Sequence, residues 1–294
     1  LIDAVMLHPY IPGAQNPDLA GYVDTLNRLN RELSAIAGKP VPMYISEIGY
    51  SAKPGGEVTA YQQAAYLARV MVLNFTIENL KACVWHIGLW NEATSRRELD
   101  FALLRKQEKG SKVYQPKPSF AAWATASRML YDAKLLRELD VGKTLRVWLF
   151  EKKGKPMLIA YSLIPETVRM QLALRAPSAE IVDMCGSRST VKCSDGILNL
   201  ELGEAPVYIL GGALEQFAAG KFNALFSPET LVTVPGGALE VKVHLPDNLS
   251  QNAALRLQPF QTGKGELSGK GNEWTLKDRK STRLNSSHDQ ISYA

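Results

Sequence analysis

The 294-residue sequence predicts an α/β fold with a parallel sheet, followed by an antiparallel β-sandwich. In residues 1–142, short apolar runs alternate with helical patterns, and this βαβα order is typical of a parallel sheet. From Thr144 onward the helical periodicity ends, and short alternating runs separated by turn residues begin. The length of the chain agrees with more than one domain, because single hydrophobic cores seldom grow beyond this size.

The first predicted strand, Ile2 to His8, ends in "HPYIPG", where two prolines and a glycine interrupt it. A helix follows, with Asn16 as its expected N-cap and Pro17 at its first position. Apolar residues recur at three- and four-residue steps as far as Ile36, and Gly38-Lys39-Pro40 ends the pattern. This helix is therefore expected to lie with one face on a core.

The second predicted strand is the apolar run "VPMYISEIG", which stops at Glu47 and Gly49. A short, nearly continuous apolar run of this kind is expected to be buried on both faces. Thr59 and Gln62 have the spacing of a capping box, which predicts a second helix that runs to the region of Asn79.

The run "KACVWHIGLW" is the third predicted strand, and Cys83 is expected to be buried in it. Because side chains alternate along a strand, His86 is expected to point away from the face that carries Trp85. A long polar loop follows, and then "PSFAAWATASRMLYDAKLLREL" predicts a third helix from Pro118 to the region of Gly142.

These changes of pattern divide the chain into four parts. Residues 1–142 form the α/β part, residues 143–212 the β-sandwich, and residues 213–277 a linker with an incomplete β domain. Residues 278–294 have no apolar periodicity, and their reverse translation resembles a common short-read sequencing adapter. This last segment is interpreted as an artefactual tail that contributes to neither fold nor function.

The composition excludes several classes of function. The formal net charge of +5 is spread along the chain, without the basic cluster and interleaved aromatic residues of a nucleic-acid groove. No apolar run approaches the roughly 20 residues that a membrane span requires. The three cysteines lack metal-ligand spacing, and Cys185 and Cys193 are either free or bridge a hairpin.

Polar and aromatic side chains cluster at the expected carboxyl ends of the three strands. They are His8 and Tyr10 after the first strand, Glu47 at the end of the second, and Trp85 with Trp90 at the third. Catalytic groups of βα-barrels project from these strand ends. Aromatic faces stack on sugar rings while polar groups bind the hydroxyls, so the combination is suited to a carbohydrate.

Five segments together resemble the C-terminal half of a clan-A retaining glycoside hydrolase, with family 39 and family 5 as the nearest types. They are "DAVMLHPY", "PVPMYISEIGYSA", "YQQAAYLARVMV", "VWHIGLW" and "KPSFAAW". The resemblance covers about residues 1–212. It implies that the chain holds strands six to eight of a (β/α)8 TIM barrel, followed by the β-sandwich that often accompanies such a barrel.

The resemblance also implies roles for individual residues. Glu47 would be the nucleophile, His8 and Tyr10 would position it and the sugar, and Trp85 would be the platform beneath the ring. Trp90 either contacts the sugar or packs the loop. Tyr50, near the expected mouth of the cleft, is a candidate for contact with a more distant sugar.

A retaining mechanism needs two carboxyl groups roughly 5 Å apart. The resemblance places the acid/base glutamate at the end of the fourth barrel strand, which would precede this chain, and Asn91-Glu92 is not a substitute because it follows the eighth strand. The chain is therefore expected to be an inactive fragment of a secreted or periplasmic glycosidase. Its substrate would be an oligo- or polysaccharide, and neither cofactor nor metal would be needed.

Three other interpretations remain open at this point. Glu47 can be an ordinary strand-end glutamate paired with a Lys or Arg. The chain can be a non-catalytic carbohydrate-binding protein with a degenerate barrel. It can also belong to an unrelated α/β enzyme whose strand-end glutamate does different acid/base work. Two further tryptophans, Trp123 and Trp148, are expected in the core.

Overall fold

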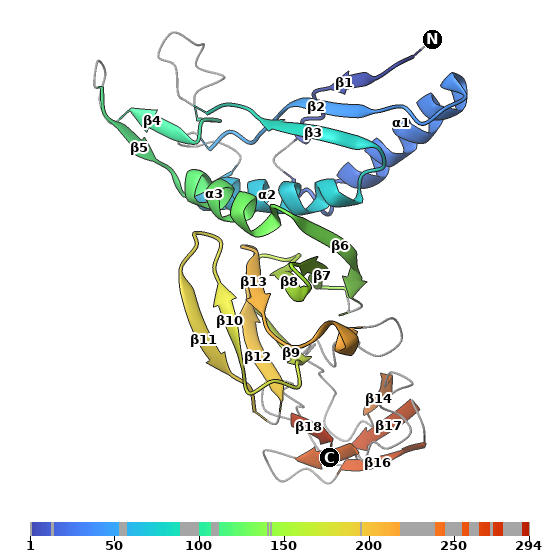
Figure 1. The fold of residues 1–294 in the computed structure, drawn as a ribbon. Helices are drawn as coiled ribbons and strands as arrows, with labels where there is room; N and C mark the ends of the chain where they lie inside the picture. Colours follow the sequence, from blue (N-terminus) through green and yellow to red (C-terminus); the bar gives the residue numbers. More distant parts are fainter. Residues whose placement is uncertain are drawn as a thin grey trace.

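The computed structural model describes most of the first 217 residues and a set of later strands. The described ranges are 2–12, 15–52, 58–88, 100–106, 112–139, 141, 143–194, 196–217, 239–244, 255–258, 265–270, 273–278 and 290–293. Trp90 and the pair Asn91-Glu92 lie outside them. Figure 1 shows a small sheet with helices along one side, and an antiparallel β region beyond those helices. The predicted mixed α/β class is confirmed in this general form.

The three predicted strands of the α/β part form one parallel sheet in the order β1-β2-β3. Their bounds are Val5–Leu7 for β1, Met43–Ile48 for β2 and Leu80–Trp85 for β3. Both pairings are parallel, so all three strands point their carboxyl ends in the same direction. The residues that follow these strands can therefore meet at one edge of the sheet.

The helices are α1 (Tyr22–Ala37), α2 (Ala60–Leu73) and α3 (Pro118–Leu130), with a 3₁₀ turn η2 at Asn74–Thr76. The predicted capping box is confirmed, since the Thr59 side chain accepts from the Gln62 backbone and the Gln62 side chain accepts from Thr59. Helix α1 begins later than expected, after Gly21. Asn16 instead accepts from the backbone of Asp18 at 3.0 Å.

One face of the sheet is buried against the helices and the other is exposed. Met43, Ile45 and Ile48 of β2 are buried in the core with residues of α1 and α2. Tyr44, between two of them, is exposed, as are large apolar residues of the neighbouring strands. The prediction that β2 is buried on both faces is therefore wrong. The prediction for Cys83 is also wrong, because its side chain lies exposed on β3.

The third helix is shorter than predicted. It ends at Leu130, and the next residues form strand β6 (Ala133–Leu139), which pairs antiparallel with β7 (Leu145–Lys152). Burial alternates along β6 with a period of two, so pairing with a neighbouring strand overrides the helical propensity of "AKLLREL". Before α3, the expected polar loop contains a short hairpin of β4 (Leu104–Lys106) and β5 (Tyr114–Pro116).

The antiparallel region contains a six-stranded sheet in the order β11-β10-β13-β8-β7-β6 and a separate pair, β12-β9. A buried cluster contains residues of β7, β8 and β10 from the large sheet and of β9 and β12 from the pair. Cys185 and Cys193 are free thiols. The remaining bounds are β8 Lys155–Ser162, β9 Val168–Ala173, β10 Ser178–Val182, β11 Arg188–Lys192, β12 Ile197–Leu202, β13 Val207–Leu210 and a 3₁₀ turn η3 at Leu214–Phe217.

The later strands form two further antiparallel sheets. One has the order β14-β17-β16, and the other pairs β15 with β18. The domain boundaries at 142, 212 and 277, and the interpretation of residues 278–294 as a tail, stay predictions. The strands are β14 Leu239–His244, β15 Leu255–Gln258, β16 Gly265–Lys270, β17 Glu273–Asp278 and β18 Gln290–Tyr293.

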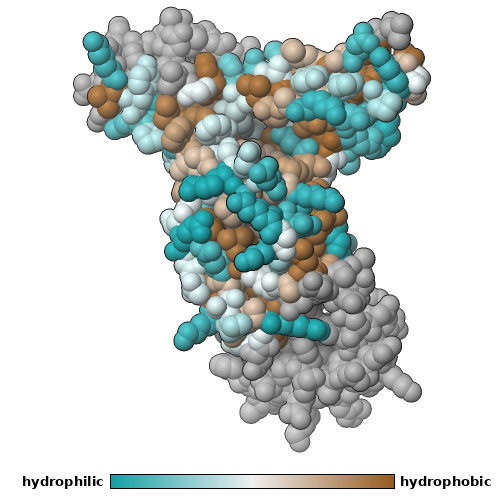
Figure 2. All heavy atoms as spheres, viewed as in Figure 1, coloured by the Kyte–Doolittle hydropathy of each residue, from teal (hydrophilic) through white to brown (hydrophobic). Residues whose placement is uncertain are grey.

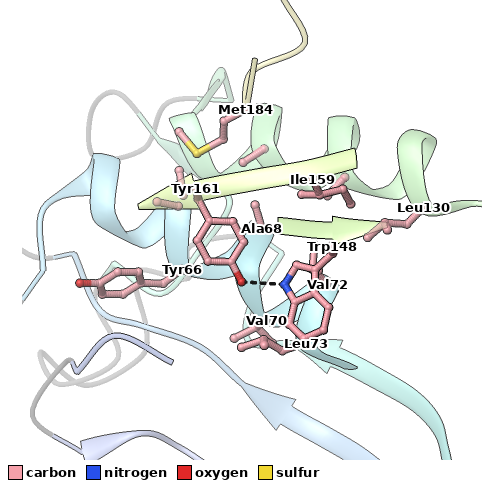
Figure 3. Packing of buried hydrophobic residues seen from close by; sticks show 14 of the residues in the cluster. Tyr66, Ala68, Val70, Val72, Leu73, Leu130, Trp148, Ile159, Tyr161 and Met184 are labelled. Carbon is pink, nitrogen blue, oxygen red and sulfur yellow. Dashed lines mark hydrogen bonds between the residues drawn. The ribbon is translucent and has the colours of Figure 1, made fainter. Parts of the chain in front are cut away.

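The α/β part and the antiparallel region share a core. Figure 3 shows Trp148 of β7 and Tyr161 of β8 beside Val72 and Leu73 of α2, and all four belong to one buried cluster. The helices thus lie between the parallel sheet and the six-stranded sheet, which joins the two parts through an apolar interface.

The surface carries both polar and apolar side chains. Figure 2 shows them interspersed over the viewed face of both parts. Trp123 is exposed on α3, contrary to prediction, whereas Trp148 is buried as predicted. None of the helices within the described ranges has the length and apolar character needed to cross a membrane.

Candidate active site

An irregularity in β2 turns Glu47 away from the buried face. In a regular strand Ile45 and Glu47 would share a face, but Ile45 and Ile48, three residues apart, are both buried. Ile45 pairs with Cys83 and Ile48 with Trp85, so β2 has one residue more than β3 in this interval. Such an extra residue redirects the side chains around it. The Glu47 side chain is 31% exposed as a result.

Two residues that follow β1, His8 and Tyr10, reach the Glu47 carboxylate. The Tyr10 hydroxyl donates a hydrogen bond to Glu47 Oε1. His8 Nδ1 lies 3.8 Å from the other oxygen, Oε2. A backbone hydrogen bond of 2.9 Å from Tyr10 N to His8 O holds the two residues in a tight turn. The structure therefore brings three of the expected site residues together.

His86 also faces the carboxylate, whereas Trp85 packs against the buried core, so the two side chains point to opposite sides as predicted. His86 Nδ1 lies 3.8 Å from Glu47 Oε1. β3 ends at Trp85, directly before His86, and the peptide bond between His86 and Ile87 is cis. The His86 N–H donates to the Ile48 carbonyl at 2.8 Å, which fixes the residue beside the end of β2.

Trp85 and Tyr50 lie in a different layer from these groups. The indole N–H of Trp85 donates to the Phe101 carbonyl at 3.2 Å, and its ring centroid is 6.4 Å from that of Tyr50. Tyr50 is buried and its hydroxyl donates to the Gln15 carbonyl at 3.1 Å. Burial raises the pKa of the Tyr50 phenol, with a smaller contribution from Tyr66. These contacts engage the polar atoms of both residues within the protein.

Phe101 completes a group of three rings beside Glu47, and the sequence did not indicate it. Its ring centroid lies 5.9 Å from that of Tyr10 and 5.5 Å from that of His86, with interplanar angles of 78° and 59°. Phe101 follows a polar stretch with no periodicity, so no motif marks it.

Gly49 is the signal that could have pointed to Phe101. A Cβ at position 49 would lie 2.6 Å from the His86 carbonyl oxygen and 2.9 Å from Phe101 Cδ1. Real Cβ atoms do not approach other atoms so closely. Position 49 therefore requires glycine, because the backbone that follows β2 passes close to the backbone that follows β3.

Imidazoles surround the Glu47 carboxylate in the part of the chain that the structure describes. Among the ion pairs of the described residues, those of Glu47 are with His8 and His86. The described residues therefore show no Lys or Arg paired with Glu47, contrary to the alternative that the sequence left open. The described ranges also contain no group of three or more His, Cys, Asp and Glu side chains that could hold a metal ion. The arrangement provides a partly exposed carboxylate with one oxygen held by a phenol.

No protein-family model matches the sequence, and a comparison with curated proteins gives no match. The fold is similar to that of a family 39 glycoside hydrolase from the gut symbiont Bacteroides cellulosilyticus WH2, with a TM-score of 0.57 and 22% identity. This similarity covers 71% of the present chain and 44% of that protein. The predicted similarity of this fold to that of glycoside hydrolases is thereby confirmed.

Two other solved structures are similar at a lower level. A glucosidase from Croceicoccus marinus has a TM-score of 0.49 and 8% identity over 70% of this chain and 53% of its own. A conserved exported protein from Bacteroides fragilis has a TM-score of 0.48 and 17% identity over 71% of this chain and 46% of its own. The chain therefore spans 44–53% of the length of these three proteins.

Proposed function

We propose that this chain carries the nucleophile half of a retaining glycosidase active site, with Glu47 as the nucleophile. The observation that carries the proposal is the setting of Glu47: a strand-end carboxylate, partly exposed, bonded by Tyr10 and flanked by two imidazoles. The similarity of fold to a family 39 glycoside hydrolase supports it. The substrate would be a carbohydrate, and the whole protein would be secreted or periplasmic.

The reaction would proceed by double displacement. Glu47 attacks the anomeric carbon, the bond to the leaving oxygen breaks with its electron pair, and a general acid protonates that oxygen. The same acid, now a base, then takes a proton from water as the water oxygen attacks the anomeric carbon and releases Glu47. Tyr10 occupies Oε1, which leaves Oε2 on the His8 side as the attacking oxygen.

The acid/base group is proposed to belong to an earlier strand of a complete barrel, outside this chain. Asp100, next to Phe101, is not a candidate because its carboxylate is paired with Lys117 at 2.8 Å. A complete barrel that lacks a carboxylate at that earlier strand end would instead favour a non-catalytic carbohydrate-binding protein.

The decisive experiment uses a full-length protein that contains the missing strands. Glu47→Gly should lower kcat on a dinitrophenyl glycoside by about 10⁴-fold or more, as loss of a nucleophile does in other enzymes. Azide should partly restore the rate and give the glycosyl azide of inverted configuration, because the small anion fills the space of the carboxylate. Wild-type-like rates in this variant would remove Glu47 from the nucleophile role.

A matched control is available at the surface. Glu78 is exposed and paired with Arg31 at 2.9 Å. Glu78→Gly should leave the rate unchanged and should not respond to azide.

The 294-residue chain alone is predicted to lack hydrolytic activity. Among the described residues, no further strand pairs with β1 or β3 of its parallel sheet, whereas a barrel closes on itself. Dinitrophenyl glycosides incubated with the purified chain should therefore release no dinitrophenol above the rate in buffer. Robust turnover that Glu47→Gly abolishes would overturn this prediction and show that the chain supplies its own acid/base.

A further inference from the structure

The segment from Asp100 to Leu104 is fixed beside the ends of β2 and β3. The backbone N–H groups of Leu103 and Leu104 donate to the carbonyls of Ile87 and Gly88 at 3.0 and 3.1 Å. Asp100 has a φ of +93°, a conformation that residues other than glycine seldom adopt. The surrounding contacts must therefore hold it in place.

An ion pair between Lys117 and Asp100 is one of these contacts. The ammonium group of Lys117 donates to the carboxylate of Asp100 at 2.8 Å and to its carbonyl at 2.9 Å. The Lys117 side chain is 1% exposed, and its burial lowers the pKa of the amine while Asp100 acts in the opposite direction. Lys117 directly precedes α3, so the pair connects this helix to the segment.

Neutral hydrogen bonds hold the same segment from the other side. The Gln63 amide, which is fully buried on α2, donates to the carbonyls of Asp100 and Tyr50 at 2.7 and 2.6 Å. The indole of Trp85 donates to the carbonyl of Phe101. The carbonyl groups of Asp100 and Phe101 are thus both hydrogen-bonded. The Phe101 ring packs against Tyr10 and His86.

We propose that Lys117 and Asp100 are positioning residues for the reaction at Glu47, acting through Phe101. The proposal rests on the function proposed above. An ion pair in a buried site is seldom the most stabilising choice, since well-packed apolar residues often do as well. What this pair provides is a fixed place for Phe101, whose ring limits the movement of the two groups that contact the nucleophile.

The chain contains a matched control for Lys117. Lys152 of β7 donates to the carbonyls of Arg128, Met129 and Tyr131 at 2.6, 2.8 and 2.8 Å. Both lysines therefore hold an end of α3 through several hydrogen bonds. Lys152 makes these contacts at the carboxyl end of the helix, away from the three rings.

The test compares Lys117→Met with Lys152→Met in the 294-residue chain labelled at Phe, Tyr and His. Both substitutions should lower Tm, but only Lys117→Met should abolish the nuclear Overhauser cross-peaks that join the Phe101 ring to Tyr10 and His86. Asp100→Asn is the second variant, because asparagine tolerates positive φ and removes only the charge. Asp100→Asn should weaken the same cross-peaks. It tests the proposal on its own if Lys117→Met does not fold.

Intact cross-peaks in both site variants, or an equal loss in Lys152→Met, would overturn the proposal. In a full-length active protein, Lys117→Met should lower kcat by about 10- to 100-fold with little change in KM, as small misplacements of catalytic groups do. The azide experiment on Glu47→Gly decides the proposed function separately, since the cross-peaks do not depend on activity.

Discussion

Glu47 and Asp18 each accept a hydrogen bond from a tyrosine, but their exposure and their charged neighbours differ. Tyr10 donates to Glu47 in the site, and Tyr161 donates to Asp18 at 2.8 Å between the two parts of the molecule. The side chain of Asp18 is 0% exposed, against 31% for Glu47.

The neighbours of Asp18 are permanent cations. Arg69 of α2 and Arg146 of β7 each place a guanidinium nitrogen 3.5 Å from its carboxylate. Burial raises the pKa of the Asp18 carboxyl, and the two arginines and Tyr161 oppose that rise. The neighbours of Glu47 are two histidines and a phenol. The comparison teaches that Asp18 is sealed and charge-paired, as a structural group is, whereas one side of Glu47 stays open to solvent.

The largest effect that separates the two carboxylates should be on stability. Asp18→Asn should lower the free energy of unfolding by about 3–5 kcal/mol, because Arg69 would remain buried without a counter-charge. Glu47→Gln should change it by less than about 0.5 kcal/mol, since its site is open to water. Urea denaturation followed by tryptophan fluorescence measures both values. Equal losses would remove the distinction between the two sites.

The two tyrosines should differ by a smaller amount. Tyr161→Phe should cost about 1–3 kcal/mol, because the buried indole N–H of Trp148, which donates to Tyr161 at 3.1 Å, would lose its acceptor. Tyr10→Phe should cost less than about 1 kcal/mol, since water can replace the phenol at Glu47. The same denaturation experiment decides, and a larger loss for Tyr10→Phe would reverse the assignment of the structural pair.

Alkaline pH provides a third test. Burial, followed by the nearby charge of Asp18, raises the pKa of the Tyr161 phenol. Above about pH 10 the unfolded chain releases this proton and the folded chain keeps it, so stability present below pH 10 is lost as the pH rises. The advantage of wild type over Tyr161→Phe should shrink by about 1.4 kcal/mol per pH unit above that point. A constant difference between pH 9 and about pH 11 would contradict the buried, neutral phenol.

A surface pair sets the lower limit of the scale. Arg31 and Glu78 lie 2.9 Å apart with side chains 61% and 47% exposed. Arg31→Ala should change the free energy of unfolding by no more than about 1 kcal/mol, because water screens exposed pairs. The change should shrink further at high salt. A loss as large as that of Asp18→Asn would show that proximity of charges alone, without burial, determines these energies.

Much of the frame around Glu47 could be predicted from the sequence. The strand-end position of Glu47, the neighbouring His8 and Tyr10, and the capping box at Thr59 depend on local patterns of turn and capping residues, which the chain displays directly. Local patterns also gave the three parallel strands. The position of the acid/base group on an earlier barrel strand stays a prediction.

Other features depend on contacts between distant segments. The contact of His86 with Glu47 depends on the pairing of β2 with β3, in which β2 has one residue more. Phe101 reaches the site because Lys117 and Gln63 hold the segment around it. The sequence of β6 has a helical pattern, but pairing with β7 determines its conformation. Alternation and propensity within one segment carry no information on such partners.

The extra residue in β2 has a consequence for anyone who transplants this site into a designed barrel. The letters "ISEIG" placed on a regular strand would put the glutamate on the same face as the first isoleucine, against the helices. The transferable unit is instead a pair of strands of unequal count, with three residues advancing on one while two advance on the other. Glycine at position 49 must travel with it, because any other residue would collide with the neighbouring strand end.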